Sequence, residues 1–265
     1  LMAWVLECET FLDEFLQLEG RGDHASQVAC ISCKACMPLF QCRDCQGMEL
    51  CCSDCCIKLH LQLPFHCVKQ WVDTHFIRVM LKSLGLFLQL DHTISDHCCN
   101  PKHVFRDEFI VIDTSSIHDV ALDFCGCRTA QTHVKQLLCA RLFPATIFNL
   151  KTAATFKVLE KYQLLSFKSK ASSYEYYQCL VQLTDNVSIN PPKDQYPSFL
   201  HVVHEWRHLK MLKCAGQGHY PNGIESMHEG QCALLCPACP QLGKNLPTDW
   251  HCATPKKQFV SFLCE

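Results

Sequence analysis

The chain has 265 residues, 48% of them hydrophobic, and this excludes a disordered chain and allows one large domain or two smaller ones. Its formal net charge of −2 does not indicate a general nucleic-acid binder, and no apolar run reaches the roughly 18 residues that a membrane span needs. The 23 cysteines and 15 histidines are unusual, because cysteine at this frequency is typical of cross-linked or metal-bound chains.

Three explanations compete for the cysteines: disulfide bonds, metal ligands, or a decayed sequence without any site. Disulfide frameworks belong mainly to short secreted chains, and the N-terminal residues show no basic segment typical of a signal peptide. Many cysteines instead form pairs two residues apart with histidines following, and such pairs can place both thiolates on one tetrahedral ion. The sequence therefore favours zinc in an intracellular protein, with no membrane segment and no small-molecule substrate.

The first expected element is a helix within residues 1–25, because residues 4–18 carry apolar side chains at helical spacing. Gly20 and Gly22 are expected to end this helix. Residues 26–72 are dense in cysteine and histidine and poor in large apolar side chains. Metal binding is therefore expected to supply most of the folding free energy of this second segment.

Residues 26–72 contain the strongest motif, three Cys-x-x-Cys pairs followed by two histidines. In a cross-brace the first and third pairs share one ion, and the second and fourth share another. Both ions would be enclosed by four protein ligands, so the sites would be structural and leave no position for water or substrate. The predicted first site is Cys30, Cys33, Cys52 and Cys55, and the predicted second site is Cys42, Cys45, His60 and His66.

Other thiols in this segment leave alternatives open. Cys36 could enter the first site if the first pair slips to Cys33 and Cys36. Cys51 and Cys56 flank the third pair, and the simpler interpretation is that both are small buried hydrophobic side chains.

A larger mixed domain is expected over residues 76–250. Strands are predicted at residues 84–90, 109–113 and 120–124, and helices from residue 152 to 213. The aromatic stripes of these helices are interpreted as core, with a capping box at Ser172–Glu175 opening a helix that turns Tyr174, Tyr177 and Val181 inward. The predicted class is therefore α+β: a small zinc cross-brace followed by a domain with an antiparallel sheet and C-terminal helices.

A third zinc site is predicted from more distant residues. The Cys125-Gly126-Cys127 motif can put two thiolates on one ion, although it is less specific than a two-residue gap. The expected partners are Cys236 and Cys239 of a second tight turn, with His92 and either Cys98 or Cys99 as substitutes. The alternatives are separate buried thiols or two sites with other partners.

Several ordered stretches resemble one family of proteins. The chain is similar to the CxC2-type cysteine-cluster regions found N-terminal to fungal KDZ transposases, and its first zinc segment resembles ZZ and B-box modules. The matching stretches are Leu18–Asp23, Cys42–Cys45, Leu81–Leu86, Ile117–Cys127, Phe143–Thr146, Thr152–Phe156, Leu183–Asn186, Trp206–Lys213 and Cys236–Pro240.

This resemblance implies a nuclear, zinc-chelating region that precedes an RNase H-like transposase core. Residues 251–265 would approach that core, so no catalytic acidic triad is assigned and the chain is not expected to be an enzyme. The partners implied are transposon DNA, the transposase, or other proteins, the last being the usual targets of ZZ and B-box modules.

Four functions remain open from the sequence. A DNA-end module could use the helix face with Arg207, Lys210 and Lys213 to contact phosphates, unless that face is merely solvated. A protein-interaction module is favoured mildly by the near-neutral charge. An inactive transposon relic is the third, and a complete transposase, which lacks an acidic triad in this sequence, is the fourth.

Overall fold

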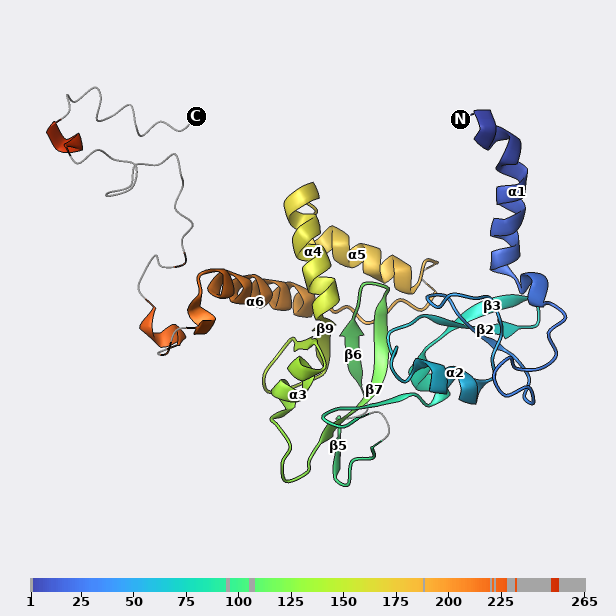
Figure 1. Cartoon of the computed structure of the whole chain (residues 1–265), viewed down its shortest axis with the longest axis horizontal. Coiled ribbons are helices and arrows are strands. Elements are labelled where there is room, and N and C mark those ends of the chain that lie inside the picture. Colours follow the sequence, from blue (N-terminus) through green and yellow to red (C-terminus); the bar gives the residue numbers. More distant parts are fainter. Residues whose placement is uncertain are drawn as a thin grey trace. The chain divides into compact units, whose positions relative to one another are not determined.

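The computed structural model describes residues 2–93, 96–104, 108–187, 189–219, 221, 223–227, 232 and 249–252. These residues form helices together with antiparallel and mixed sheets, which confirms the predicted α+β class (Figure 1). The chain divides into two compact units, Leu1–Trp206 and Arg207–Glu265. The second unit contains the last turns of α6 (Tyr196–Cys214) and short 3₁₀ turns at Gln217–His219, Ile224–Ser226 and Trp250–Cys252.

The chain opens with the predicted helix, α1 (Met2–Glu19). The Lys69 ammonium donates to the Leu18 carbonyl over 3.3 Å, and the Arg21 guanidinium lies 5.9 Å from the Trp71 ring centroid. These contacts hold the C-terminal end of α1 against the next module. Its apolar side chains are nevertheless exposed, namely Trp4, Val5, Leu6, Phe11, Leu12, Phe15, Leu16 and Leu18.

The second module is a three-stranded antiparallel sheet with one short helix. The strands β1 (Phe40–Cys42), β2 (Val68–Val72) and β3 (His75–Val79) pair in chain order, and α2 (Ser53–His60) lies between β1 and β2 in sequence. Its buried core consists largely of thiols, with few large apolar side chains, as the composition of the segment predicted. The buried members are Cys30, Phe40, Cys51, Cys52, Cys55, Cys56, Val68, Leu81 and Leu86.

A six-stranded sheet follows, in the order β4-β7-β6-β9-β8, with β5 also paired to β7. The β4–β7 and β6–β9 pairings are parallel and the others are antiparallel, so the sheet is mixed and only partly antiparallel. The strands are β4 (Phe87–Gln89), β5 (Pro101–His103), β6 (Phe109–Ile112), β7 (Ile117–Cys125), β8 (Leu142–Pro144) and β9 (Thr152–Thr155).

Alternate side chains of β6 pack into two different hydrophobic clusters, because successive residues of a strand face opposite sides of a sheet. Phe109 and Val111 join a cluster that includes Leu137 of α3 (His133–Cys139). Ile110 and Ile112 belong with the aromatic cluster on the other side. That cluster is formed with the helices α4 (Phe156–Ser169), α5 (Ser173–Thr184) and α6.

The C-terminal helices were predicted from residue 152, but residues 152–155 form β9 and the first helix begins at Phe156. Ser172 and Glu175 form the expected capping box at the start of α5. Tyr177 is buried as predicted, but Tyr174 is 55% exposed and Tyr176 is buried in its place. Tyr174 lies in the first turn of α5, where its ring contacts the ring of Tyr196 at the edge of the core.

The predicted strand at residues 84–90 is shorter in the structure. Leu81–Leu84 forms a 3₁₀ turn that ends at Gly85 with a φ of 99°, and only Phe87–Gln89 is a strand. A positive φ favours glycine, so Gly85 ends the turn, and the strand begins only at Phe87.

Arg78 of β3 connects the small module to the large sheet. Its guanidinium donates to Ser116 Oγ over 2.7 Å and to the Leu183 carbonyl over 3.0 Å, and it also donates to the Thr184 carbonyl. Partial burial lowers the pKa of Arg78 from its ordinary value. One partly buried side chain therefore hydrogen-bonds to groups at the start of β7 and at the end of α5.

Candidate metal centres

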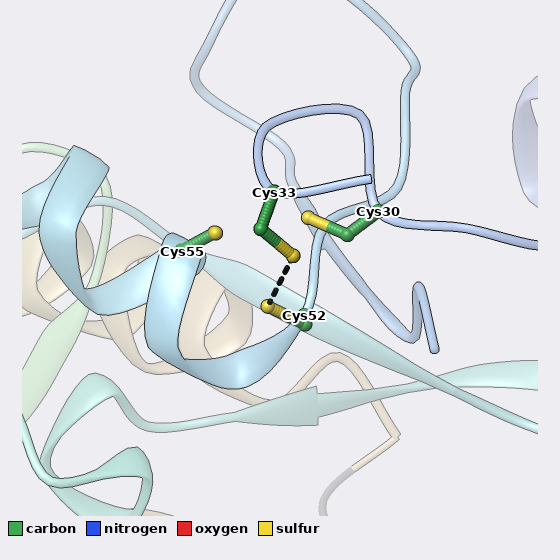
Figure 2. A group of neighbouring side chains, drawn as sticks. All are labelled: Cys30, Cys33, Cys52 and Cys55. Carbon is green, nitrogen blue, oxygen red and sulfur yellow. Dashed lines mark hydrogen bonds between the residues drawn. The ribbon is translucent and has the colours of Figure 1, made fainter. Parts of the chain in front are cut away.

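The first cluster brings together the four side chains of the predicted first site, Cys30, Cys33, Cys52 and Cys55 (Figure 2). The Cys33 and Cys52 sulfurs are 3.8 Å apart. Cys30 and Cys33 come from a tight loop, while Cys52 and Cys55 come from the start of α2, so two segments supply two thiols each.

Local backbone geometry explains this arrangement. Cys52 is the N-cap residue of α2, so Cys55 follows it within the first helical turn and its side chain returns to the same side. In the loop, the Cys30 N–H donates to the Cys36 carbonyl and the Lys34 N–H donates to the Cys30 carbonyl, both over 2.8 Å. These bonds curl the loop so that its two thiols face α2.

The second cluster brings together Cys42, Cys45, His60 and His66, the predicted second site. His66 Nδ1 lies 3.4 Å from both sulfurs, and His60 Nε2 lies 3.6 Å from the Cys45 sulfur. His60 Nδ1 is 2.7 Å from the Cys56 carbonyl, so this nitrogen carries the proton and Nε2 is left as the ligand atom. The fold thereby fixes the tautomer that a metal requires.

Donor spacing tests whether a tetrahedral ion fits. Bonds of about 2.3 Å to sulfur and about 2.0 Å to nitrogen imply separations between donor atoms of roughly 3.4–3.8 Å. The four distances given above for the first two clusters, 3.4 to 3.8 Å, match this range. Every cysteine in the described ranges is a free thiol, so disulfide bonds do not account for these contacts.

The thiol pKa values show why these clusters favour a cation. Backbone hydrogen bonds from Cys36 and Ala35 lower the pKa of Cys33 to about 6, whereas a hydrogen bond with Cys52 raises the pKa of Cys55 to about 12. In the second cluster, burial raises the pKa of Cys42 to about 12. Neighbouring thiols cannot all ionise without a positive charge between them, and a divalent ion supplies that charge.

A third cluster joins His92, Cys98, Cys125 and Cys127. His92 Nε2 is 3.1 Å from the Cys125 sulfur and 3.7 Å from the Cys127 sulfur, and the Cys98 sulfur is 3.6 Å from that of Cys127. The structure therefore brings the Cys-x-Cys pair together with two of the residues expected as substitutes.

The other predicted partners of the third site, Cys236 and Cys239, lie outside the described residues, so their role stays a prediction. The sequence named His92 and Cys98 only as substitutes, because folding brings them to the Cys125–Cys127 pair from a distance. His92 and Cys98 lie between β4 and β5 in the sequence. Both of these strands pair with β7, β4 in parallel and β5 antiparallel, so His92 and Cys98 come close to the end of β7.

Residues that are not ligands hold the third cluster in place. Gln136, buried on α3, accepts from the Cys125 N–H over 2.8 Å and donates to the Cys125 carbonyl over 2.9 Å. Gly126 donates to the Asn100 carbonyl over 2.9 Å, and a Cβ at Gly126 would lie 2.8 Å from that oxygen. Glycine between the two cysteines therefore permits this close backbone approach.

Two further features bear on other predicted functions. In the predicted phosphate-binding face, Lys213 is exposed, while Arg207 and Lys210 are only partly exposed. No helix among the described residues is both long and apolar enough to cross a membrane.

Comparison with known proteins finds a match to the region around the third cluster. Residues 81–188 match the family described as the CxC2-like cysteine cluster associated with KDZ transposases. This match includes His92, Cys98, Cys125 and Cys127, whereas the first two clusters precede it. No curated protein and no solved structure matches the chain.

Proposed function

We propose that this chain, whose residues 81–188 match the CxC2-like cysteine cluster associated with KDZ transposases, is a zinc-stabilised accessory region of such a transposase. The observation that carries the proposal is the presence of three groups, each with four sulfur or imidazole donors close together. Four protein ligands close a tetrahedral zinc site, which makes the ion structural and not catalytic. The region would then act by recognising other macromolecules.

A protein partner is favoured by the surface of α1. Trp4 and Phe15 of this helix are 54% and 66% exposed. The helix carries five acidic residues and no basic one, and the acids lie on both sides of the apolar face. This combination suits a partner groove with an apolar floor and basic edges. It disfavours pairing between two copies of α1, since like charges would meet.

Transposon DNA is the alternative partner, and α6 gives it less support. Of the three basic side chains on the predicted contact face, only Lys213 is fully exposed. The net charge of −2 also provides no general attraction to phosphates.

The partner can be tested with a KDZ transposase core expressed separately. We expect the zinc-loaded chain to bind this core and the double substitution Phe11→Glu with Phe15→Glu to abolish binding. The matched control, Thr10→Glu with Gln17→Glu, adds the same charge on the polar face and should bind like the wild type. Equal loss in both variants would reject the apolar face as the contact.

DNA binding and catalysis need separate assays. Retention on transposon-end DNA that falls steeply with salt, without binding to the core, would replace the protein-interaction proposal by the DNA-end function. Binding to neither would favour an inactive relic. Cleavage of labelled DNA in the presence of magnesium, surviving purification controls, would overturn the assignment as a non-catalytic region.

A further inference from the structure

A fifth donor, the sulfur of Cys99, lies beside the four residues of the third cluster. The Cys99 sulfur lies 3.4 Å from the sulfur of Cys127, a shorter distance than the 3.6 Å from Cys98 to Cys127. His92 and Cys125 complete the set. A tetrahedral zinc ion takes four ligands, so one of the five donors is surplus at any moment.

The surplus donor is either Cys98 or Cys99. Cys125 is fixed by both hydrogen bonds to Gln136, and Cys127 follows Gly126, whose backbone pairs with Asn100 through the Gly126 N–H and carbonyl. In contrast, Cys98 and Cys99 are adjacent residues that precede β5 and belong to no helix or strand. Both of their sulfurs already lie within 3.6 Å of the Cys127 sulfur.

We propose that Cys98 and Cys99 alternate as the fourth ligand of the third zinc ion. The inference rests on the proposed zinc occupancy of this cluster. In each exchange the Cys99 thiol gives up its proton, and its sulfur forms a bond to zinc as the bond to Cys98 breaks. The released Cys98 thiolate takes up a proton, so the ion keeps its charge and four ligands throughout. Cys99 is exposed and Cys98 is partly buried, so exchange brings a different thiol to the solvent.

Alkylation of the wild-type protein tests the exchange directly. Trypsin releases residues 83–102 as one peptide whose only cysteines are Cys98 and Cys99. The zinc-loaded chain is treated briefly with iodoacetamide, and the modified position is located by tandem mass spectrometry. We expect singly modified peptides in two forms, one carrying the label on Cys98 and the other on Cys99.

Two labelling patterns would overturn the exchange. Label on Cys99 alone would mean that Cys98 is a permanent ligand, and absence of label on both would mean that both are held. Label on both cysteines of the same peptide, in protein with fewer than three zinc equivalents, would instead contradict zinc binding at the cluster itself. The zinc content of the same sample therefore separates failure of the exchange from failure of the proposed site.

Substitution gives a second, independent test. Because either thiol suffices, Cys98→Ala and Cys99→Ala should each keep the zinc content of the wild type, while the double substitution should lose one equivalent. Cys139→Ala, which removes an exposed thiol outside the three clusters, is the control. Loss of one equivalent in Cys98→Ala alone, with the other two sites filled, would contradict the exchange.

Discussion

Residues outside the donor set determine where the ligands of each metal centre lie. The carbonyl of Cys56 orients His60, and Gln136 holds the backbone of Cys125. Such partners commonly matter almost as much as the ligands, because they fix ring tautomers and donor positions before the metal binds.

Substitution of Gln136 tests this role at the third cluster. Gln136→Leu keeps the apolar volume but leaves the Cys125 N–H and carbonyl without their partners. We expect the zinc affinity of the third site to fall about 10- to 100-fold, with the other two sites unchanged. Competition with a chromogenic chelator measures this, and Gln131→Leu, which alters an exposed side chain nearby, should behave like the wild type. Equal zinc affinities in Gln136→Leu and the wild type would show that the hydrogen bonds from Gln136 to Cys125 are not needed for zinc binding.

His118 is the residue that should make stability depend on pH. Burial lowers its pKa to about 4, and Ser116 Oγ, which accepts from Arg78, can donate its own proton to His118 Nε2 over 2.8 Å. The folded state thus holds His118 neutral, whereas the unfolded chain takes up a proton below its ordinary pKa near 6.5. The contribution of His118 is therefore complete above pH 6.5 and is lost as the pH falls towards 4.

The expected loss of unfolding free energy follows from the pKa values of His118 in the folded and unfolded states. Between about pH 7 and about pH 5, the wild type should lose about 2 kcal/mol more unfolding free energy than His118→Gln, whose side chain stays neutral. Urea denaturation of both proteins at the two pH values measures the difference. Zinc release affects both alike, and parallel pH profiles would contradict a neutral buried His118.

Short sequence spacing predicted all four residues of each of the first two clusters, but only Cys125 and Cys127 of the third. Cys52 and Cys55 lie within one helical turn, and Cys30 and Cys33 within one loop, so their spacing alone indicates a shared ion. His92 joins Cys125 only through the pairing of β4 with β7. Zinc as the ion, and Cys236 and Cys239 as ligands, stay predictions.

At the scale of elements, local sequence signals predicted which helices and strands form better than they predicted what these elements pack against. The capping box of α5 was predicted correctly, because it depends on residues three positions apart. The parallel pairings of β4 and β9 have no comparable local signal, since parallel strands need long crossovers. The spacing in α1 predicted a helix, but periodicity cannot tell whether an apolar face is covered by the same chain or by a partner.

Arg78 makes the contact between β3 and the large sheet testable. Arg78→Met should destabilise the protein by about 2 kcal/mol, because the buried Ser116 hydroxyl and the carbonyl of the buried Thr184 lose a charged donor. The control Lys82→Met removes a partly exposed ion pair with Asp119 and should cost no more than about 1 kcal/mol. Chemical denaturation measures the free energy of unfolding of both variants. Equal losses would show that Arg78 stabilises the protein no more than the surface ion pair of Lys82 does.

For the whole molecule, metal binding and hydrophobic burial are expected to stabilise different regions. The core of the small module contains Cys30, Cys52 and Cys55, which are themselves candidate ligands. The cluster beneath α4 to α6 consists of aromatic and aliphatic side chains without any of the donors. Loss of metal should therefore unfold the first region more readily than the second.

Hydrogen exchange can resolve this difference. After chelation, we expect amide protection to be lost over residues 30–66 and retained in β6, β9 and α4. Exchange of the zinc-loaded chain under the same buffer conditions is the reference. A uniform change along the chain would contradict the division of stability between metal and apolar core.

The most direct test is the amount of zinc bound per chain, measured by elemental analysis of natively purified protein. The three clusters predict three equivalents, and two would leave the third cluster in question. Essentially no zinc in folded protein would contradict the central claim that these cysteines and histidines form metal centres.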